Sequence, residues 1–236
     1  YGLRGKYQFD IISLNVGSSG LFGGGDVDAL IQIPAKPFSG FVQSWARWRE
    51  RILSTKLPRQ LLVVGGGAAG VELAFALAAF ARSAPALAGS VVTLATQEAS
   101  VLNDMDPAIQ ERVSRSLRER GVIIFPKLHF LGTETDVARF SGGKAMKTDL
   151  VIVATGSRPF PWLAESARRG GISLGANQAL LIEKNLKVRG AFGVFAAGDC
   201  AEISGEPLPR SGVHALRQGD VLGRNLLAMS RNPQSS

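Results

Sequence analysis

The stretch that decides the fold lies at residues 61–73 and reads LLVVGGGAAGVEL. Four apolar residues precede three consecutive glycines, and a run of helix-favouring residues follows directly. A buried parallel strand that turns sharply into a buried helix has this pattern, since glycine permits the tight turn. Residues 65–70 also fit the G-x-G-x-x-G pattern of dinucleotide-binding turns. The stretch therefore predicts a strand, a turn and a helix at the centre of a nucleotide-binding domain.

The glycine spacing suggests a task for each position of this turn. Gly65 would make the tight turn, Gly67 would let a pyrophosphate approach the backbone, and Gly70 would let helix and strand pack closely. Ala68 and Ala69 begin the helix, whose free N–H groups and positive dipole end favour phosphate. The alternative is a glycine-rich turn that holds no ligand.

Strand and helix signals alternate over residues 58–156, which is typical of a parallel, doubly wound α/β domain. Asp106 and Pro107 mark a helix start, and Gly121 marks its end. The expected strands are residues 61–64, 91–95, 122–125 and 150–154, the expected helices begin at residues 68 and 106, and residues 130–147 form a small antiparallel excursion.

The flanking residues repeat this theme less completely. A short strand at residues 9–14 is followed by a loop that runs from Gly17 through Gly23-Gly24-Gly25 to Pro37, and then by a helix that ends before Pro58. A strand at residues 194–197 and a helix at residues 213–228 close the chain. We expect the first and last strands to share one sheet. The predicted organisation is thus a partial domain with a crossing helix (1–57), an inserted complete domain (58–157) and a return to the first domain (158–236).

Charge argues against a nucleic-acid binder. The net charge is +8, from 27 basic and 19 acidic residues, but the basic residues are scattered. Arg112, Arg115 and Arg118 recur at helical spacing, yet Glu111 and Glu119 stand among them, which indicates a solvated helix face. Anionic dinucleotides are a sufficient reason for the positive balance.

Location is indicated by two features of the sequence. Residues 61–81 contain a single charge, Glu72, and imitate a membrane span, but the three glycines separate a strand-like half from a helix-like half. Cys200 is the one cysteine, which favours a reducing compartment. No signal peptide is visible, but because Tyr1 is not a methionine we expect the sequence to begin inside a longer protein, so this absence does not bear on location. We expect a cytoplasmic protein whose contact with the inner membrane is at most peripheral.

The sequence leaves the choice between NAD and NADP open. Dinucleotide domains that bind NAD place an acidic residue near the end of the second strand, where it holds the ribose hydroxyls. Here that position falls on Thr96, and Glu98 lies two residues further on and offers a substitute. An arginine that would bind a 2′-phosphate is missing nearby, which favours NAD.

These motifs together resemble the pyridine-nucleotide-disulfide oxidoreductase superfamily. Within it, the chain is similar to FAD proteins of the type II NADH dehydrogenase kind, and especially to the flavoprotein domain associated with selenide, water dikinase. The matching pieces, in the family's order, are residues 9–14 with Gly17-Ser18, residues 35–37, the helix that holds Trp45 and Trp48, and residues 63–73, 153–156, 194–200 and 212–219. The resemblance implies an α/β fold with two Rossmann-like FAD- and NAD(P)-binding domains, the NAD(P) domain being complete and inserted in a partial FAD domain.

The resemblance also implies roles for single residues. Asp199 would hydrogen-bond the FAD ribityl chain, Gly198 would admit the flavin phosphates, and Gly17 belongs to the same side. The helix that starts near Val213 and His214 would point its amide end at the flavin carbonyl. On the nicotinamide-nucleotide side, Glu72 would lie near the nicotinamide and Gly156 would line the site.

Each of these residues also has a purely structural interpretation. Asp199 could cap a turn, and Glu72 could be an acidic residue favoured by the helix dipole. Cys200 is expected to be a packing residue, as are Trp45 and Trp48. No metal-ligand spacing surrounds the two histidines, so we assign no metal.

The chain departs from the family at its start. The family's first G-x-G-x-x-G, which binds the ADP half of FAD, does not precede Phe9. The Cys-x-x-Cys of thioredoxin reductases is absent from the nicotinamide domain. Half of the expected FAD site therefore lies outside this sequence.

Two functions of different classes follow. The first is an FAD-dependent NAD(P)H oxidoreductase that passes hydride from nicotinamide to flavin and electrons on to a small acceptor, such as a quinone; no side chain is assigned as catalytic. The second is a nucleotide-binding sensor or scaffold that partners a selenophosphate-forming kinase. A single-domain NAD dehydrogenase without flavin is a third reading, against which Gly198-Asp199 argues.

Overall fold

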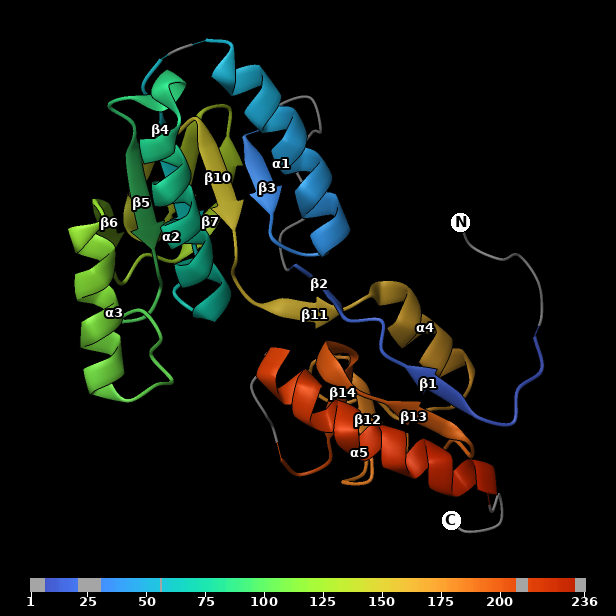
Figure 1. The fold of residues 1–236 in the computed structure, drawn as a ribbon. Coiled ribbons are helices and arrows are strands. Elements are labelled where there is room, and N and C mark those ends of the chain that lie inside the picture. The colour runs from blue at the N-terminus through green and yellow to red at the C-terminus, as the bar shows by residue number, and fades with distance from the viewer. Residues whose placement is uncertain (1–6, 21–30, 56, 207–211, 232–236) are drawn as a thin grey trace. The chain divides into compact units, whose positions relative to one another are not determined.

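The computed structural model describes residues 7–20, 31–55, 57–206 and 212–231 of the chain (Figure 1). The contacts between residues divide the chain into two compact units. The larger unit is residues 20–156, and the smaller unit joins residues 1–19 to residues 157–236. An inserted domain produces this division, because the chain leaves the smaller unit and later returns to it.

The larger unit is built on a five-stranded sheet in which every strand is parallel to its neighbours. In spatial order the strands are β3 (Gln32–Pro34), β10 (Leu150–Val153), β4 (Gln60–Val64), β5 (Val91–Ala95) and β6 (Val122–Phe125). The carboxyl ends of parallel strands lie at one edge of the sheet, so the loops that follow β4, β5 and β10 are brought together there.

Three helices cover one face of this sheet. Successive strand residues point to opposite faces, so Leu61 and Val63 of β4 pack in a core with the helices, while Leu62 and Val64 pack in a different cluster on the other face. The helices are α1 (Phe38–Leu53), α2 (Ala68–Ser83) and α3 (Pro107–Glu119) (Figure 1). Trp48 of α1 is fully buried in the helical core.

The opposite face is covered by an antiparallel sheet. Its strands are β7 (Phe130–Glu134), β8 (Val137–Phe140) and β9 (Ala145–Lys147), with a single 3-10 turn at Ser141–Gly143. The predicted antiparallel excursion is thus confirmed. It packs Phe130 and Phe140 against Val64 and Val151 in one cluster, so strands take the place that a helix would have in a doubly wound sheet.

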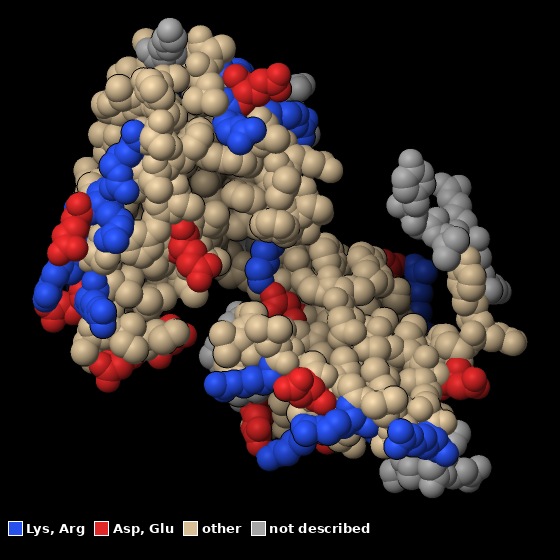
Figure 2. Space-filling view, in the orientation of Figure 1, with Lys and Arg blue, Asp and Glu red and all other residues tan. Residues whose placement is uncertain are grey.

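Helix α3 shows how the local sequence sets an element's ends. The Asp106 side chain accepts a hydrogen bond from the backbone N–H of Ala108 at 2.8 Å, and Pro107 occupies the first turn. Gly121 follows the helix with a φ of 79°, a left-handed conformation that glycine adopts without strain. Glu111 and Arg115 form an ion pair of 2.6 Å one turn apart, and charges of both signs lie along this helix in Figure 2. The interpretation of α3 as a solvated helix face agrees with this arrangement.

The smaller unit contains short strand pairs and two helices. β1 (Ile12–Leu14) pairs in parallel with β13 (Val194–Ala196), which confirms that the first and last expected strands share a sheet. The other elements are β2 (Ser18–Gly20) beside β11 (Ser157–Pro159), β12 (Leu180–Ile182) beside β14 (Ala201–Ile203), α4 (Pro161–Arg169) and α5 (Gly212–Arg231). Their core includes Phe195 and Cys200, both with no exposed surface, and Leu222 of α5.

The structure corrects one expectation about the fold and adds one helix and a second way of dividing the chain. Residues 32–34, expected to belong to a loop, form the edge strand β3, in which Ile33 is fully buried beside β10. Residues 161–169, for which the sequence analysis predicts no element, form α4. The division of contacts at residues 19 and 20 does not coincide with the expected domain boundary at residues 57 and 58, because β3 and α1 pack within the larger unit. Gly23-Gly24-Gly25 lie outside the described residues.

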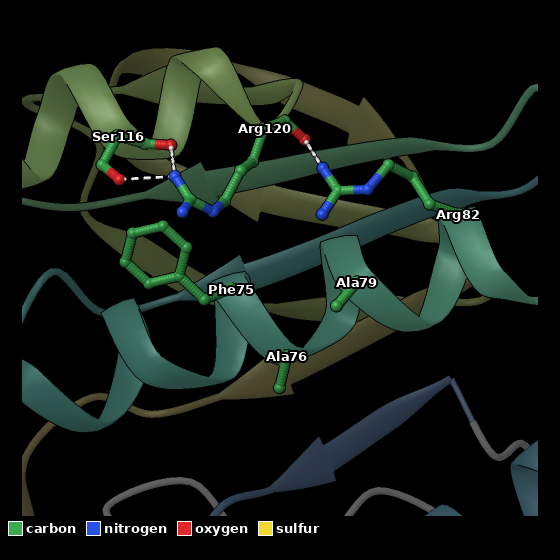
Figure 3. Close-up of a pocket in the computed structure, with 6 residues that line it drawn as sticks. All are labelled: Phe75, Ala76, Ala79, Arg82, Ser116 and Arg120. Carbon is green, nitrogen blue, oxygen red and sulfur yellow. Dashed lines mark hydrogen bonds between the residues drawn. The ribbon is translucent and has the colours of Figure 1, made fainter.

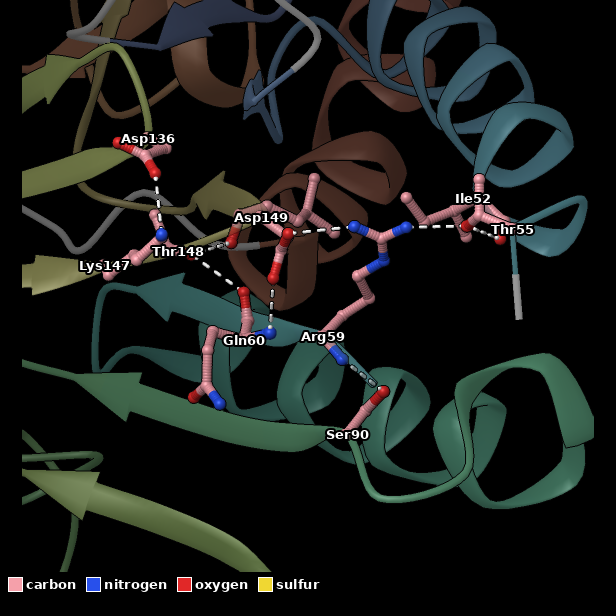
Figure 4. A network of polar contacts seen from close by, with 10 residues as sticks. Ile52, Thr55, Arg59, Gln60, Ser90, Asp136, Lys147, Thr148 and Asp149 are labelled. Atoms are coloured by element: carbon pink, nitrogen blue, oxygen red, sulfur yellow. Dashed lines mark hydrogen bonds and ion pairs between the residues drawn. The ribbon is translucent and has the colours of Figure 1, made fainter. Parts of the chain in front are cut away.

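A polar network ties the amino edge of the large sheet together (Figure 4). The Arg59 guanidinium donates to Asp149 Oδ1 at 3.1 Å and to Thr55 Oγ1 at 2.6 Å. Asp149 Oδ2 accepts the backbone N–H of Gln60 at 2.8 Å, and Ser90 Oγ accepts the N–H of Arg59 at 2.9 Å. The Arg59 side chain therefore joins the start of β4 to the start of β10 through an ion pair, and to Thr55 just after α1 through a hydrogen bond.

We expect Asp149→Ala to lower the free energy of unfolding of the larger unit by about 2 to 3 kcal/mol, because it leaves a partly buried Arg59 without its counter-charge. Lys147→Met is the control: Lys147 is 81% exposed and paired with Asp136, so its loss should cost about 0.5 kcal/mol or less. Urea unfolding followed by tryptophan fluorescence in a Trp162→Phe background measures both, since Trp45 and Trp48 then report the larger unit alone. Equal midpoints for the two variants would contradict the assignment.

Candidate functional site

The turn between β4 and α2 leaves no room for side chains at two of its glycines. A Cβ at Gly65, whose φ is 121°, would lie 2.5 Å from the carbonyl oxygen of Ala154. A Cβ at Gly70 would overlap the carbonyl oxygen of Gly65 itself. The N–H of Gly65 donates to the carbonyl of Ala95 at 2.8 Å. The turn is therefore pressed against the carboxyl ends of β5 and β10, as the spacing of its glycines predicts.

Gly67 differs from its neighbours, because open space surrounds it. A Cβ there would meet nothing within 4 Å, and its φ of −75° is one that any residue adopts. It precedes the first turn of α2, where Ala68 and Ala69 are exposed and carry only methyl groups. The first N–H groups of a helix have no partner inside it, so a ligand placed here meets free donors and a positive dipole end. This position fits a pyrophosphate.

The loop after β10 contains a buried hydroxyl group, that of Thr155. Thr155 Oγ1 is buried and has no hydrogen-bond partner among the described residues. Its backbone nitrogen lies 3.0 Å from the position of a Cβ on Gly65, so the hydroxyl belongs to the same turn region. Gly156 follows, exposed, with a φ of 40°. The sequence singled out Gly156 and not Thr155; an unsatisfied buried hydroxyl is visible only in the fold.

The Thr96 side chain, predicted to lie near the ribose, is buried beside the glycine turn. The side chain is only 1% exposed and occupies the space in which a Cβ on Gly66 would lie. Its Oγ1 accepts the backbone N–H of Glu98 at 3.2 Å. Gln97, Glu98 and Ala99 of this loop are exposed, whereas the Thr96 side chain packs against the glycine turn, and the predicted contact of Thr96 with the ribose stays a prediction. Glu72 lies exposed on the second turn of α2.

The smaller unit brings the predicted flavin-side residues together. β13 leads into a 3-10 turn at Gly198–Cys200, in which Gly198 has a φ of 74° and donates its N–H to Gln218 Oε1 of α5 at 2.7 Å. Ser18 Oγ, next to Gly17, donates to Asp199 Oδ2 at 2.7 Å. The residues that join these loops, Ser18 and Gln218, were not among the predicted contacts. Their only signal in the sequence is their place beside motif glycines.

The first turn of α5 lies against this loop. A Cβ at Gly198 would lie 3.6 Å from the Cβ of Ala215. Val213 is 58% exposed and His214 is half-buried in the same turn. Two glycine-containing loops and a helix start thus converge, an arrangement that suits a phosphate or a flavin edge. No metal-binding group of three His, Cys, Asp or Glu side chains occurs in the described part of the chain.

Cys200 packs in the core of the smaller unit and does not face this loop's surface. It has no exposed area, and its Sγ donates to the carbonyl oxygens of Leu14 and Ala197, each at 3.3 Å. Burial raises the pKa of the Cys200 thiol above its usual value. The thiol is therefore held in its neutral, unreactive form.

A hollow on the helical face of the larger unit is a separate feature (Figure 3). It is lined by Phe75, Ala76 and Ala79 of α2 and by Arg82, Ser116 and Arg120. Arg120 donates to Ser116 and lies 5.4 Å from the centre of the Phe75 ring. These residues belong to the middle and end of α2 and to the end of α3 with the residue that follows it, and none of them is part of the glycine turn, so the hollow is a separate feature.

The fold and the turn at residues 65–70 define a dinucleotide-binding α/β protein. The model of the pyridine nucleotide-disulphide oxidoreductase family matches residues 22–219, and the chain belongs to this family. None of the described helices combines the length and the apolar character needed to cross a membrane. The strand β4 and the turn that follows it explain why residues 61–81 imitate such a span.

Comparison with known proteins finds relatives by sequence and similar solved structures. The nitric oxide reductase FlRd-NAD(+) reductase of Shigella flexneri is 33% identical over 227 residues, which cover 94% of this chain and 54% of that protein. The solved structure of reduced Bacillus anthracis CoADR-RHD has a TM-score of 0.71 at 20% identity, over 97% of this chain and 39% of that one. The water-forming NADH oxidase of Lactobacillus brevis, solved with NADH, has a TM-score of 0.69 at 22% identity, over 94% and 47%. The chain thus spans about half the length of the curated relative, and the two structures show a common fold.

We expect Gly70→Ala to destabilise the larger unit by about 3 kcal/mol or more, because the new methyl group overlaps a backbone carbonyl that cannot move aside. Gly67→Ala should change stability by about 0.5 kcal/mol or less, since its methyl group enters open space. Urea unfolding of both variants in the Trp162→Phe background provides the measurement. A similar loss in both would mean that the turn is not packed as described.

Alkylation of Cys200 by iodoacetamide should be at least about a hundredfold slower in the folded protein than in urea, because the buried thiol reacts only after the fold opens locally.

The raised pKa of the Cys200 thiol also predicts that the stability of the protein depends on pH. Its stabilisation is present below the unfolded thiol's pKa of about 8.5 and is lost as pH rises above it toward the folded pKa. Between pH 7 and pH 9.5 the native protein should lose more stability than Cys200→Ala. Equal losses would refute the effect.

Proposed function

We propose that this chain forms the dinucleotide-binding core of an FAD-dependent NAD(P)H oxidoreductase. The observation that carries the proposal is the turn at residues 65–70, packed so tightly that only Gly67 and the start of α2 remain open to a ligand. The buried Thr155 hydroxyl beside it has no protein partner among the described residues and supplies one more group for that ligand. The larger unit is therefore assigned to the nicotinamide nucleotide and the smaller unit to FAD.

In the larger unit, each candidate residue has a definite task toward the nucleotide. The N–H groups of Ala68 and Ala69 and the dipole of α2 would hold the pyrophosphate close to Gly67. Gly156 and Glu72 lie exposed along the predicted path of the nucleotide and would line its nicotinamide end. No acid or base is required of these side chains, because they position the nucleotide and exclude water.

In the smaller unit, the residues present fit part of an FAD site. Asp199 would accept hydrogen bonds from ribityl hydroxyls, and Gly17, which has a positive φ and open space around it, would let a phosphate approach the backbone beside Gly198. The start of α5, at Val213 and His214, would direct its positive dipole end at the flavin ring. When bound, FAD supplies the hydride acceptor and the one-electron chemistry.

A protein acceptor is favoured over a quinone as the destination of the electrons. The Shigella flexneri relative is named as a reductase of FlRd, and it is 33% identical over 94% of this chain. We therefore propose a redox protein as the partner and a reducing, cytoplasmic setting, with which the one buried cysteine agrees. The sensor or scaffold function, with selenide, water dikinase as partner, becomes an outcome of the test.

Anaerobic titration of the full-length natural protein tests the proposal. We expect a visible flavin band that bleaches when NADH or NADPH is added. Gly67→Ala should keep the flavin band and the fold, yet need about tenfold or more nucleotide for half-bleaching, because its methyl group fills the space that a pyrophosphate requires. Gly223→Ala of α5, which also enters open space, is the control and should bleach as the native protein does. A flavin band that neither nucleotide bleaches would refute the oxidoreductase and favour the scaffold.

A further inference from the structure

The hollow between α2 and α3 combines an apolar floor with an open outer side (Figure 3). It has a volume of about 440 Å³. Ala76 and Ala79 are exposed and contribute only methyl groups, and the half-buried Phe75 ring lies beside them. All the lining residues come from α2, from α3 and from the residue that follows α3. A small-molecule pocket encloses most of its ligand, so a hollow with two walls suits a segment of a larger molecule.

Two guanidinium groups lie in this hollow without a counter-charge. Arg82 Nη1 donates to the carbonyl oxygen of Arg120 at 3.0 Å. Arg120 Nη1 donates to the carbonyl and the hydroxyl of Ser116 at 3.1 and 2.6 Å, and its guanidinium carbon lies 5.4 Å from the centre of the Phe75 ring. Among the ion pairs of the described residues, none involves Arg82 or Arg120. Each guanidinium is therefore held in place by uncharged groups and keeps further N–H donors for a ligand.

The spacing of the two guanidinium groups indicates the shape of that ligand. They rest on the carbonyl oxygens of Ser116 and Arg120, which are four residues and thus about 6 Å apart along the helix. Two carboxylates one turn apart on a partner helix have the same separation, and each fits the planar face of a guanidinium. An apolar side chain on the same face of that helix would lie over the methyl groups of Ala76 and Ala79.

The charges around the hollow favour a short acidic segment over other anionic or apolar partners. Glu72, one turn before Ala76, and Glu119, next to Arg120, are both exposed and confine the positive surface to the hollow. A nucleic acid binds through many phosphate contacts along an extended basic surface, which these two carboxylates interrupt. A second copy of this chain, with a net charge of +8, would be repelled.

We propose that the hollow between α2 and α3 is a docking site for an acidic helix of a partner protein. Two carboxylates of that helix pair with Arg82 and Arg120, and an apolar side chain between them covers Ala76 and Ala79. The hollow shares no residue with the glycine turn, so this docking site does not depend on the proposed oxidoreductase function.

Alanine methyl NMR of the full-length protein tests the proposal, because Ala76 and Ala79 report directly from the floor of the hollow. The probe is an alanine-based helical peptide of about 17 residues, with one glutamate, a leucine three residues later and a second glutamate four residues later. Titration should shift both methyl signals with a Kd of about 1 mM or below. Raising NaCl from about 50 mM to about 300 mM should weaken binding several-fold, because exposed charges are screened.

Matched variants separate the charge of the hollow from charge elsewhere. Arg82→Gln and Arg120→Gln should each raise the Kd about threefold, and the double variant about tenfold. Arg118→Gln removes the same charge from another face of α3 and should leave the Kd unchanged. A peptide with glutamines in place of both glutamates should bind at least about tenfold more weakly. Unchanged methyl signals outside the hollow show that each variant is folded.

Four outcomes would overturn the proposal. The first is the absence of methyl shifts up to about 10 mM peptide, and the second is equal binding of the glutamine peptide. The third is a duplex oligonucleotide of about 12 base pairs that binds more tightly than the acidic peptide and loses this binding in the double variant, which assigns the hollow to nucleic acid. The fourth is a shift of the two methyl signals with protein concentration alone, which assigns it to a second copy.

Discussion

The close approach of Gly70 to the carbonyl oxygen of Gly65 is the constraint on which the rest of the larger unit depends. No side chain fits between them, so the first turn of α2 packs directly on the turn that ends β4. This contact fixes the direction of the helix relative to the strand and, through Gly65, places the turn against Ala154, the residue after β10. Because of this contact, the groups exposed to a ligand at this edge are the free N–H groups at the start of α2 and the backbone of Gly67.

The two edges of the large sheet are held by different forces. At the amino edge, Arg59 and Asp149 form an ion pair with partly buried side chains that joins β4 to β10. At the carboxyl edge, backbone hydrogen bonds join successive loops, such as those of Thr96 to Phe125 and Leu128. Charged side chains thus occupy the amino edge, while the carboxyl edge has loops that are held by backbone hydrogen bonds and an exposed surface. This difference suits a domain that binds its ligand at the carboxyl edge only.

In the smaller unit, too, a glycine at the end of a strand allows the start of a helix to approach closely. β13 ends at Gly198, and the start of α5 approaches closely enough for Ala215 to contact it. Asp199 is held by Ser18, which comes from a part of the chain about 180 residues earlier. The insertion of the larger unit between these two segments explains how residues so distant in sequence form one loop cluster.

The sequence by itself determined the elements around the glycine turn, the antiparallel excursion and the existence of the first and last strands. Those features depend on local periodicity, on helix caps such as Asp106, and on glycine spacing, all of which are properties of neighbouring residues. Only the tertiary structure decided that residues 32–34 are an edge strand, that Thr96 faces inward, and that Thr155 lacks a partner. Each of these depends on a contact between residues far apart in the chain, and a short run ending in Pro34 carries no periodic signal of its own.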